Sequence, residues 1–139
     1  MKALTVRQPW AQLILQGIKV IEVRSWVPDY RGRILVHAGN KVEEEACERL
    51  RIPKEELVKG AILGSVAIVQ VLEFTQDSWE RLRPLTLEVG TLSGRLLGWT
   101  LGNPILLQQP LPWRGSLGLF DVPDEVIPER VRAGRCDQT

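Results

Sequence analysis

The apolar and polar positions of the chain alternate between a strand-like and a helix-like period, which predicts an α+β domain. Apolar, β-branched runs typical of strands occupy residues 3–6, 20–24, 33–38 and 61–74. The last of these runs is nearly continuous, as in a central strand buried on both faces. Residues 96–122 carry further strand-like runs broken by glycine and proline, which favours short barrel strands that turn sharply.

Helical spacing predicts three helices, over residues 9–16, 41–51 and 76–83, with a short extra turn before residue 59. The first has Pro9 in its opening turn and Gly17 as its stop. Residues 84–95 give no clear pattern, and the chain from residue 130 is polar and expected to fray. A length of 139 residues suits one domain, predicted over residues 1–130, with a polar tail over 131–139.

Residues 17–24, with the sequence GIKVIEVR, place three charged side chains in a stretch otherwise built for burial. Because side chains alternate along a strand, Glu22 and Arg24 share the face opposite the apolar residues. Lys19 joins them only if it lies in the turn after Gly17, before strict alternation begins. Such a row suits a pocket wall that binds anions and accepts hydrogen bonds. The alternative is an exposed ion pair on an edge strand, which contributes roughly 0–1 kcal/mol.

Charge is unevenly distributed along the chain. The net charge is only +1, which does not indicate a globally basic nucleic-acid binder. Residues 1–40 carry +4 and the remainder −3, so one electropositive face is expected. The charge pattern does not identify which anion that face would meet.

Several classes of function are disfavoured by what the sequence contains. His37 is the single histidine and lies in a predicted strand, where a hydrogen-bonded core role is more common than catalysis. The two cysteines, Cys47 and Cys136, have no metal or disulfide spacing, and there is no P-loop or dinucleotide fingerprint. No metal or cofactor is therefore expected. No apolar run approaches the roughly 20 residues that span a bilayer, and no signal-peptide pattern is present, so a cytoplasmic location without membrane contact is expected.

Gly17, Lys19, Glu22 and Arg24 match the GxKxxExR motif of the ASCH domain, a branch of the PUA-like superfamily, which the chain therefore resembles. The resemblance extends to the family's opening strand and first helix (residues 4–11) and its following strand (residues 31–38). Residues 103–127 are similar to small single-domain members, including the endothelial-overexpressed lipopolysaccharide-associated factors. The resemblance implies a PUA-like small mixed β-barrel with flanking helices.

The resemblance also implies a ligand-binding cleft beside the barrel, lined by the motif and the end of the first strand. RNA, a nucleotide or a modified nucleoside is the expected ligand. Basic side chains would hold phosphate, amide or carboxylate groups would meet a base edge, and tryptophan would stack for about 1–3 kcal/mol per base. The expected ligand-binding residues are Thr5, Arg7, Gln8, Lys19, Glu22, Arg24, Trp26, Trp113 and Arg114.

Two other functions stay open at this point. Some small ASCH proteins resemble N4-acetylcytidine amidohydrolases that use a lysine, a threonine and a glutamate. Their lysine matches Lys19, but their threonine falls at Glu22 and their glutamate roughly at Ala67. Their mechanism therefore does not transfer as written, although Lys19 and Glu22 remain catalytic candidates for a metal-independent amidohydrolase or ribonuclease. A protein-interaction domain with a structural charged row is the second alternative. The sequence leaves the oligomeric state open.

Overall fold

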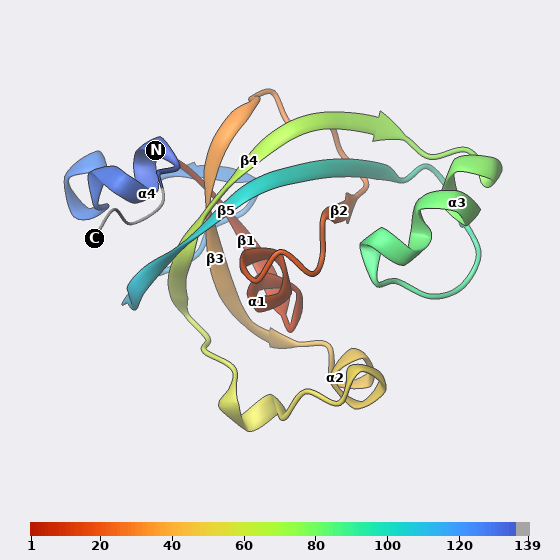
Figure 1. Cartoon of the computed structure of the whole chain (residues 1–139), viewed down its shortest axis with the longest axis horizontal. Coiled ribbons are helices and arrows are strands. Elements are labelled where there is room, and N and C mark those ends of the chain that lie inside the picture. The colour runs from red at the N-terminus through yellow and green to blue at the C-terminus, as the bar shows by residue number, and fades with distance from the viewer. Residues whose placement is uncertain (136–139) are drawn as a thin grey trace.

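The computed structural model describes residues 1–135, whose strands form one six-stranded sheet in the order β2-β5-β4-β3-β1-β6 (Figure 1). The strands are β1 (Lys2–Gln8), β2 (Ile21–Arg24), β3 (Gly32–Val42), β4 (Ala61–Glu73), β5 (Leu97–Pro112) and β6 (Leu119–Asp121). β1 and β3 run parallel, and the other four neighbouring pairs are antiparallel. The predicted α+β class is confirmed. The described sheet curls without closing, because β2 and β6 remain its two edges, so the barrel is only approximate.

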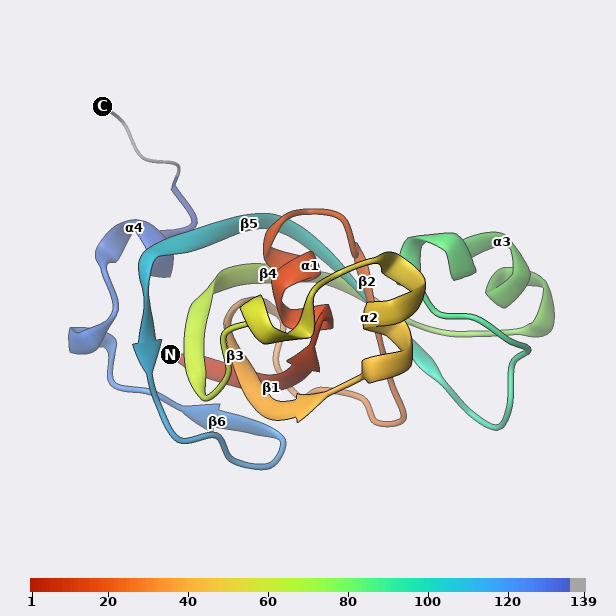
Figure 2. The ribbon, with the colours of Figure 1, turned by 90° about the horizontal axis from the view of Figure 1, so that it is seen from below.

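Four α-helices and two short 3₁₀ turns accompany the described sheet. They are α1 (Trp10–Leu15), α2 (Glu44–Leu50), η1 (Lys54–Glu56), α3 (Gln76–Thr86), η2 (Asp124–Val126) and α4 (Glu129–Ala133). α1 contacts β1, β3, β4 and β5, and Figure 2 shows β4 and β5 curving around it. Its buried side chains, among them Leu13 and Ile14, fill the main hydrophobic core. α1 thus packs inside the curled sheet and contributes to its hydrophobic core.

The end of α1 sets the course of the chain into β2. Gly17 adopts a left-handed φ of 76°, as predicted for the stop of this helix. The carbonyl of Leu13 then accepts hydrogen bonds from the backbone N–H groups of Ile18 and Lys19, at 2.9 and 3.0 Å. These bonds fold Lys19 back against the helix before β2 begins at Ile21.

The last third of the described chain departs from the prediction of several short strands. Residues 97–112 form one strand of 16 residues, β5, and only the three-residue β6 follows. The pairing of β5 with β4 contains three register shifts, so the glycines and prolines bend one long strand instead of separating several. Gly64 lies at one shift, where an added Cβ would come within 2.2 Å of the carbonyl oxygen of Ile105.

Two further predictions need correction. The helix expected over 76–83 continues through Pro84 to Thr86, and ends with Leu87 in a left-handed conformation. The fraying expected from residue 130 is wrong for residues 130–133, because they belong to α4. Val131 is fully buried there, and its carbonyl accepts a 2.6 Å hydrogen bond from Ser65. Residues 136–139, including Cys136, lie outside the described residues.

Candidate functional site

The charged row predicted from residues 17–24 forms, but its lysine is buried. Lys19 precedes β2, as the alternation argument requires, and its Nζ lies 3.8 Å from Glu22 Oε1. That Nζ also donates to the carbonyl oxygen of Thr86 at 2.5 Å and stands 4.6 Å from the centre of the Trp10 ring. Only 1% of Lys19 is exposed, and burial lowers the pKa of its ammonium group below the ordinary value, against the attraction of Glu22. Lys19 therefore lies behind the surface it was expected to line.

Arg24 joins the motif to the first strand. Its Nε donates to Glu22 Oε2 at 2.8 Å, and its Nη2 donates to the carbonyl oxygen of Thr5 at 2.9 Å. These two bonds fix the orientation of the Glu22 carboxylate between Arg24 on one side and Lys19 on the other. Glu22 and Arg24 thus share one face, as the strand period predicts.

The Thr5 side chain continues this network to a loop near the end of the chain. His37 Nε2 lies 2.7 Å from the Trp113 carbonyl oxygen, so this nitrogen carries a proton and donates. In the neutral ring, Nδ1 then accepts from the Thr5 hydroxyl at 3.1 Å. His37 is 3% exposed and both of its ring nitrogens are engaged, which confirms the expected core role. Gly115 passes over this pair, where a Cβ would approach Thr5 Oγ1 to 2.6 Å.

These elements enclose a cleft of about 870 Å³. Its lining includes the Glu22–Trp26 stretch, Leu4 and Trp10, and the loop around Leu117. Leu117 is 96% exposed, so the lining includes an apolar side chain open to solvent. This volume lies within the range of about 300–1,000 Å³ that is usual for small-molecule sites. Five of the expected ligand-binding residues line the cleft: Thr5, Arg7, Glu22, Arg24 and Trp26.

The other four expected residues lie elsewhere. Gln8 is fully buried, because its side chain donates to the carbonyl oxygen of Val58 at 2.8 Å and accepts from the backbone of Gln12. Lys19 is covered by Trp10. Trp113 packs against a second, smaller group of buried apolar residues that includes Leu35 and Ile62, and its neighbour Arg114 is exposed outside the cleft. These four side chains therefore do not line the cleft described above.

The cleft is balanced in charge, where the sequence predicted a basic one. Its charged lining consists of three basic and three acidic residues, namely Arg7, Arg24, Lys41, Glu22, Glu43 and Glu88. Arg7 Nη1 pairs with Glu43 Oε1 at 2.9 Å, across elements that lie 36 positions apart in the sequence. Lys2 and Arg7 of the basic segment 1–40 are therefore paired with acids from other parts of the fold, Asp121 and Glu43.

Trp26 is the tryptophan best placed to contact a ligand. It lies in the loop after β2, is partly exposed and lines the cleft, as expected for the best exposed aromatic candidate. Its ring meets Trp99 in a T-shaped contact, with centroids 4.9 Å apart and planes at 87°. Trp99 is fully buried, so this contact anchors the Trp26 ring beside the cleft.

Glu88 is a cleft residue that could not be predicted from the sequence, because it lies in the stretch without a clear pattern. It follows the end of α3, and its backbone N–H donates to the Thr86 hydroxyl at 3.0 Å. Burial raises the pKa of the Glu88 carboxyl, Lys19 opposes that rise, and Glu22 adds to it. Asn40 and Lys41 of β3 also line the cleft and were assigned no role from the sequence.

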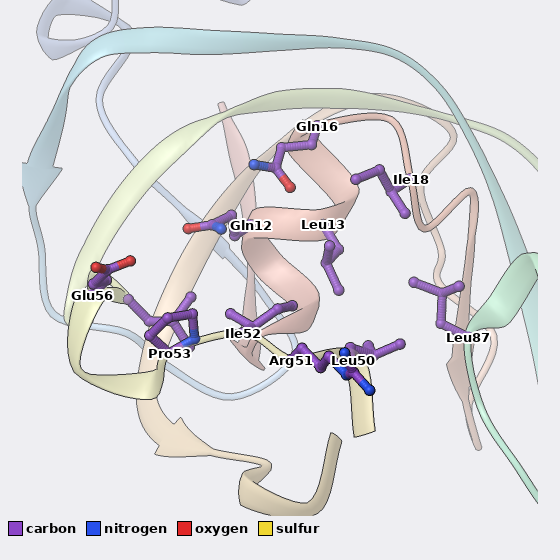
Figure 3. A pocket seen from close by; sticks show the side chains of 11 residues that line it. Gln12, Leu13, Gln16, Ile18, Leu50, Arg51, Ile52, Pro53, Glu56 and Leu87 are labelled. Atoms are coloured by element: carbon purple, nitrogen blue, oxygen red, sulfur yellow. The ribbon is translucent and has the colours of Figure 1, made fainter. Parts of the chain in front are cut away.

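A second hollow, of about 490 Å³, lies between α1 and the segment that follows α2 (Figure 3). Leu13, Ile18, Ile52 and Leu87 make it mainly apolar, and Arg51 and Glu56 are its charged lining residues. It shares no residue with the cleft of Glu22 and Trp26. The described part of the chain contains no cluster of three or more histidine, cysteine, aspartate or glutamate residues placed to hold a metal ion. It also contains no helix long and apolar enough to cross a membrane.

Solved structures show the same fold. The ASCH protein of Zymomonas mobilis aligns with a TM-score of 0.65 and 13% identity, covering 89% of this chain and 88% of that one. A single-substitution variant of that protein aligns with the same TM-score and 12% identity, covering 89% and 91% of the two chains. At this level of identity the likeness concerns the fold alone.

Curated sequences point the same way. "Activating signal cointegrator 1" of Homo sapiens is 35% identical over 85 residues, and its Mus musculus counterpart is 34% identical over 85 residues. Each match covers 52% of this chain but 15% of the relative, so this chain corresponds to a small part of those proteins. The profile of the "ASCH domain" matches residues 4–110, a span that includes β1 through most of β5. This chain belongs to the ASCH domain family.

Proposed function

We propose that the chain binds RNA, or a nucleotide-like ligand, in the cleft between Glu22, Trp26 and Glu88. The PUA-like folds to which ASCH domains belong are associated with RNA binding. The observation that carries the proposal for this chain is Trp26, a partly exposed aromatic ring that contacts the buried Trp99 and lines a cleft of about 870 Å³. A base stacked on such a ring gains about 1–3 kcal/mol.

The polar lining supports the same ligand class. Glu22 is held by Arg24 and offers a fixed acceptor to the N–H groups of a base. Lys41 and Arg7, which also line the cleft, provide cationic groups for phosphate, although Arg7 already pairs with Glu43. Because the lining is balanced in charge, we expect stacking and hydrogen bonding to contribute more to affinity than phosphate contacts do.

The test is fluorescence anisotropy with a labelled mixed-sequence single-stranded RNA at low and moderate salt. We expect Trp26→Ala to weaken binding about 5- to 150-fold, as the loss of one stacked base requires, and Trp26→Phe to restore most of it. Arg81→Ala changes an exposed arginine of α3 outside the cleft and serves as the control. Affinity unchanged by Trp26→Ala, in a protein whose melting temperature shows it folded, would remove the cleft from the binding site.

The salt dependence of binding distinguishes phosphate contacts from stacking and hydrogen bonding. Binding is expected to weaken as salt rises, and the slope of log affinity against log salt concentration measures this. On single strands, each phosphate neutralised by a basic side chain adds about 0.7 to the magnitude of that slope. For this cleft we expect a slope of about one to two, because Lys41 and Arg7 are its candidate phosphate ligands. A slope several times larger would indicate a basic surface outside the cleft.

One observation favours hydrolysis as a second candidate function. Lys19 is buried beside Glu22 and its pKa is lowered by desolvation, a combination that is frequent at catalytic sites. Glu22 would be the group that touches the substrate, since it lines the cleft and Lys19 lies behind it. Glu22→Gln should then abolish turnover of a bound N4-acylcytidine or RNA without abolishing binding. Turnover that survives this change would refute the candidate.

A further inference from the structure

Glu88 differs from the other two carboxylates that line the cleft. Glu22 is bonded to Arg24 and lies near Lys19, and Glu43 is bonded to Arg7. Within residues 1–135, the structure shows no hydrogen bond or ion pair to the Glu88 carboxylate. It is therefore the carboxylate of the cleft lining whose two oxygens both remain available to a ligand.

The backbone around Glu88 is held firmly, which distinguishes this residue from an ordinary surface glutamate. Its N–H donates to the Thr86 hydroxyl, and the carbonyl of the same threonine accepts from the buried Lys19 ammonium group. Thr86 itself is fully buried. Leu87, which lies between Thr86 and Glu88, has a left-handed φ of 61° and lines the apolar hollow beside α1. The chain thus projects Glu88 toward the cleft from a fixed position.

The chemistry of a carboxylate then restricts the ligand. An ionised carboxylate only accepts hydrogen bonds, through two oxygens side by side. Guanine presents two adjacent N–H donors on its Watson–Crick edge, at N1 and N2. Adenine and cytosine present one donor beside an acceptor nitrogen, which would face a carboxylate oxygen without a proton between them. Uracil presents a single N–H flanked by two carbonyl oxygens, which repel a carboxylate.

The geometry points to Glu88 as the residue that reads the base, and we propose that the cleft selects guanine, either in a free nucleotide or in single-stranded RNA. This inference rests on the proposed function, because it assumes that a base occupies the cleft. It adds a specificity that the family assignment does not supply. Glu22 is already bonded to Arg24, so it contributes less to the choice of base than Glu88 does.

Calorimetric titration of the whole chain with guanosine, adenosine, cytidine and uridine 5′-monophosphates tests the inference. A bidentate pair discriminates against the wrong base by about 1–3 kcal/mol, so we expect guanosine monophosphate to bind about 5- to 150-fold more tightly than the other three. Glu88→Gln keeps the shape of the side chain but replaces one acceptor by a donor. This variant should lose the preference through weaker guanosine monophosphate binding and through unchanged or tighter uridine monophosphate binding, because an amide does not repel the uracil carbonyl oxygens as a carboxylate does.

Two further arms complete the experiment. Glu80→Gln changes an exposed glutamate on α3, outside the cleft, and should keep the preference. Uridine pentamers with and without one central guanine distinguish RNA from a free nucleotide as the source of the base. A larger guanine preference in the pentamers than in the monophosphates identifies RNA, and the reverse identifies a nucleotide.

The possible results distinguish a failure of the guanine assignment from a failure of the proposed binding function. Equal affinity for the four bases, with binding still lost in Trp26→Ala, overturns the guanine assignment and leaves the cleft as the binding site. A guanine preference that survives in Glu88→Gln overturns the assignment to Glu88. If neither the monophosphates nor the pentamers bind the original chain, the proposed function and this inference fall together.

Discussion

Replacing Lys19 by methionine measures what the buried motif lysine contributes to stability. Methionine fills a similar length, so the change removes the charge without opening a large cavity. At the 3.8 Å separation of Lys19 Nζ from Glu22 Oε1, two unit charges attract by about 4 kcal/mol at an effective dielectric constant of about 20. The hydrogen bond to the Thr86 carbonyl adds about 1.5–3 kcal/mol. Desolvation of the ammonium group opposes both by several kcal/mol.

Removing one partner of a buried pair generally costs about 3–5 kcal/mol, because the other partner is left uncompensated. Glu22 keeps its bond to Arg24, so we expect the lower end, about 3 kcal/mol. For a domain of this length that loss lowers the melting temperature by about 10 °C. Urea denaturation, analysed with an unchanged slope, gives the free energy directly. Lys54→Met, which breaks only an exposed ion pair with Glu44, is the matched control and should leave the midpoint unchanged.

A denaturation midpoint for Lys19→Met equal to or above that of the original chain would refute this reasoning. It would mean that the desolvation of Lys19 outweighs all of its contacts. The double variant Lys19→Met/Glu22→Gln then measures the attraction between Lys19 and Glu22 separately from the desolvation of Lys19. If the pair interacts as described, the two changes together destabilise less than the sum of the single changes, by about 0.5–3 kcal/mol.

Three further predictions concern the frame of the site. Gly64→Ala should destabilise by about 1–3 kcal/mol in urea, because its Cβ would meet the Ile105 carbonyl at 2.2 Å, whereas Gly102→Ala, facing an exposed valine side chain, should change little. Thr5→Val should cost about 1 kcal/mol through the lost bond to His37, with faster amide exchange in residues 113–118; unchanged exchange would contradict the network. Glu88→Gln should raise the melting temperature at neutral pH but not well below the ordinary pKa of 4.5. The reason is that a carboxyl whose pKa is raised on folding destabilises only while it is ionised, so an equal effect at both pH values would refute that origin.

The local features of the site were predictable because they depend on neighbouring residues. Strand alternation placed Glu22 and Arg24 on one face, and Gly17 predicted the turn that brings Lys19 beside them. The family motif then indicated where the cleft lies. The α+β class followed from the two hydrophobic periods alone.

What the sequence could not predict depends on residues brought together from distant parts of the chain. Lys19 is buried because Trp10 from α1 and Thr86 from the end of α3 cover it, and the second of these lies 67 positions away. The expected basic face is neutralised in part, because Glu43 pairs with Arg7 from the start of the α2 segment. Glu88 was missed because the turn after α3 has no periodic pattern that would mark it.

Because Lys19 is buried, the motif lysine positions other cleft residues instead of binding a ligand itself. A lysine at the surface would bind an anion, but this one binds the carbonyl of Thr86 and stands beside Glu22. It therefore connects the β2 wall of the cleft to the segment that carries Glu88, two residues after Thr86. One buried ammonium group positions both an occupied carboxylate and a free one. Loss of Lys19 should for this reason reduce base selectivity more than it reduces affinity for uridine nucleotides, even though the side chain itself touches no ligand.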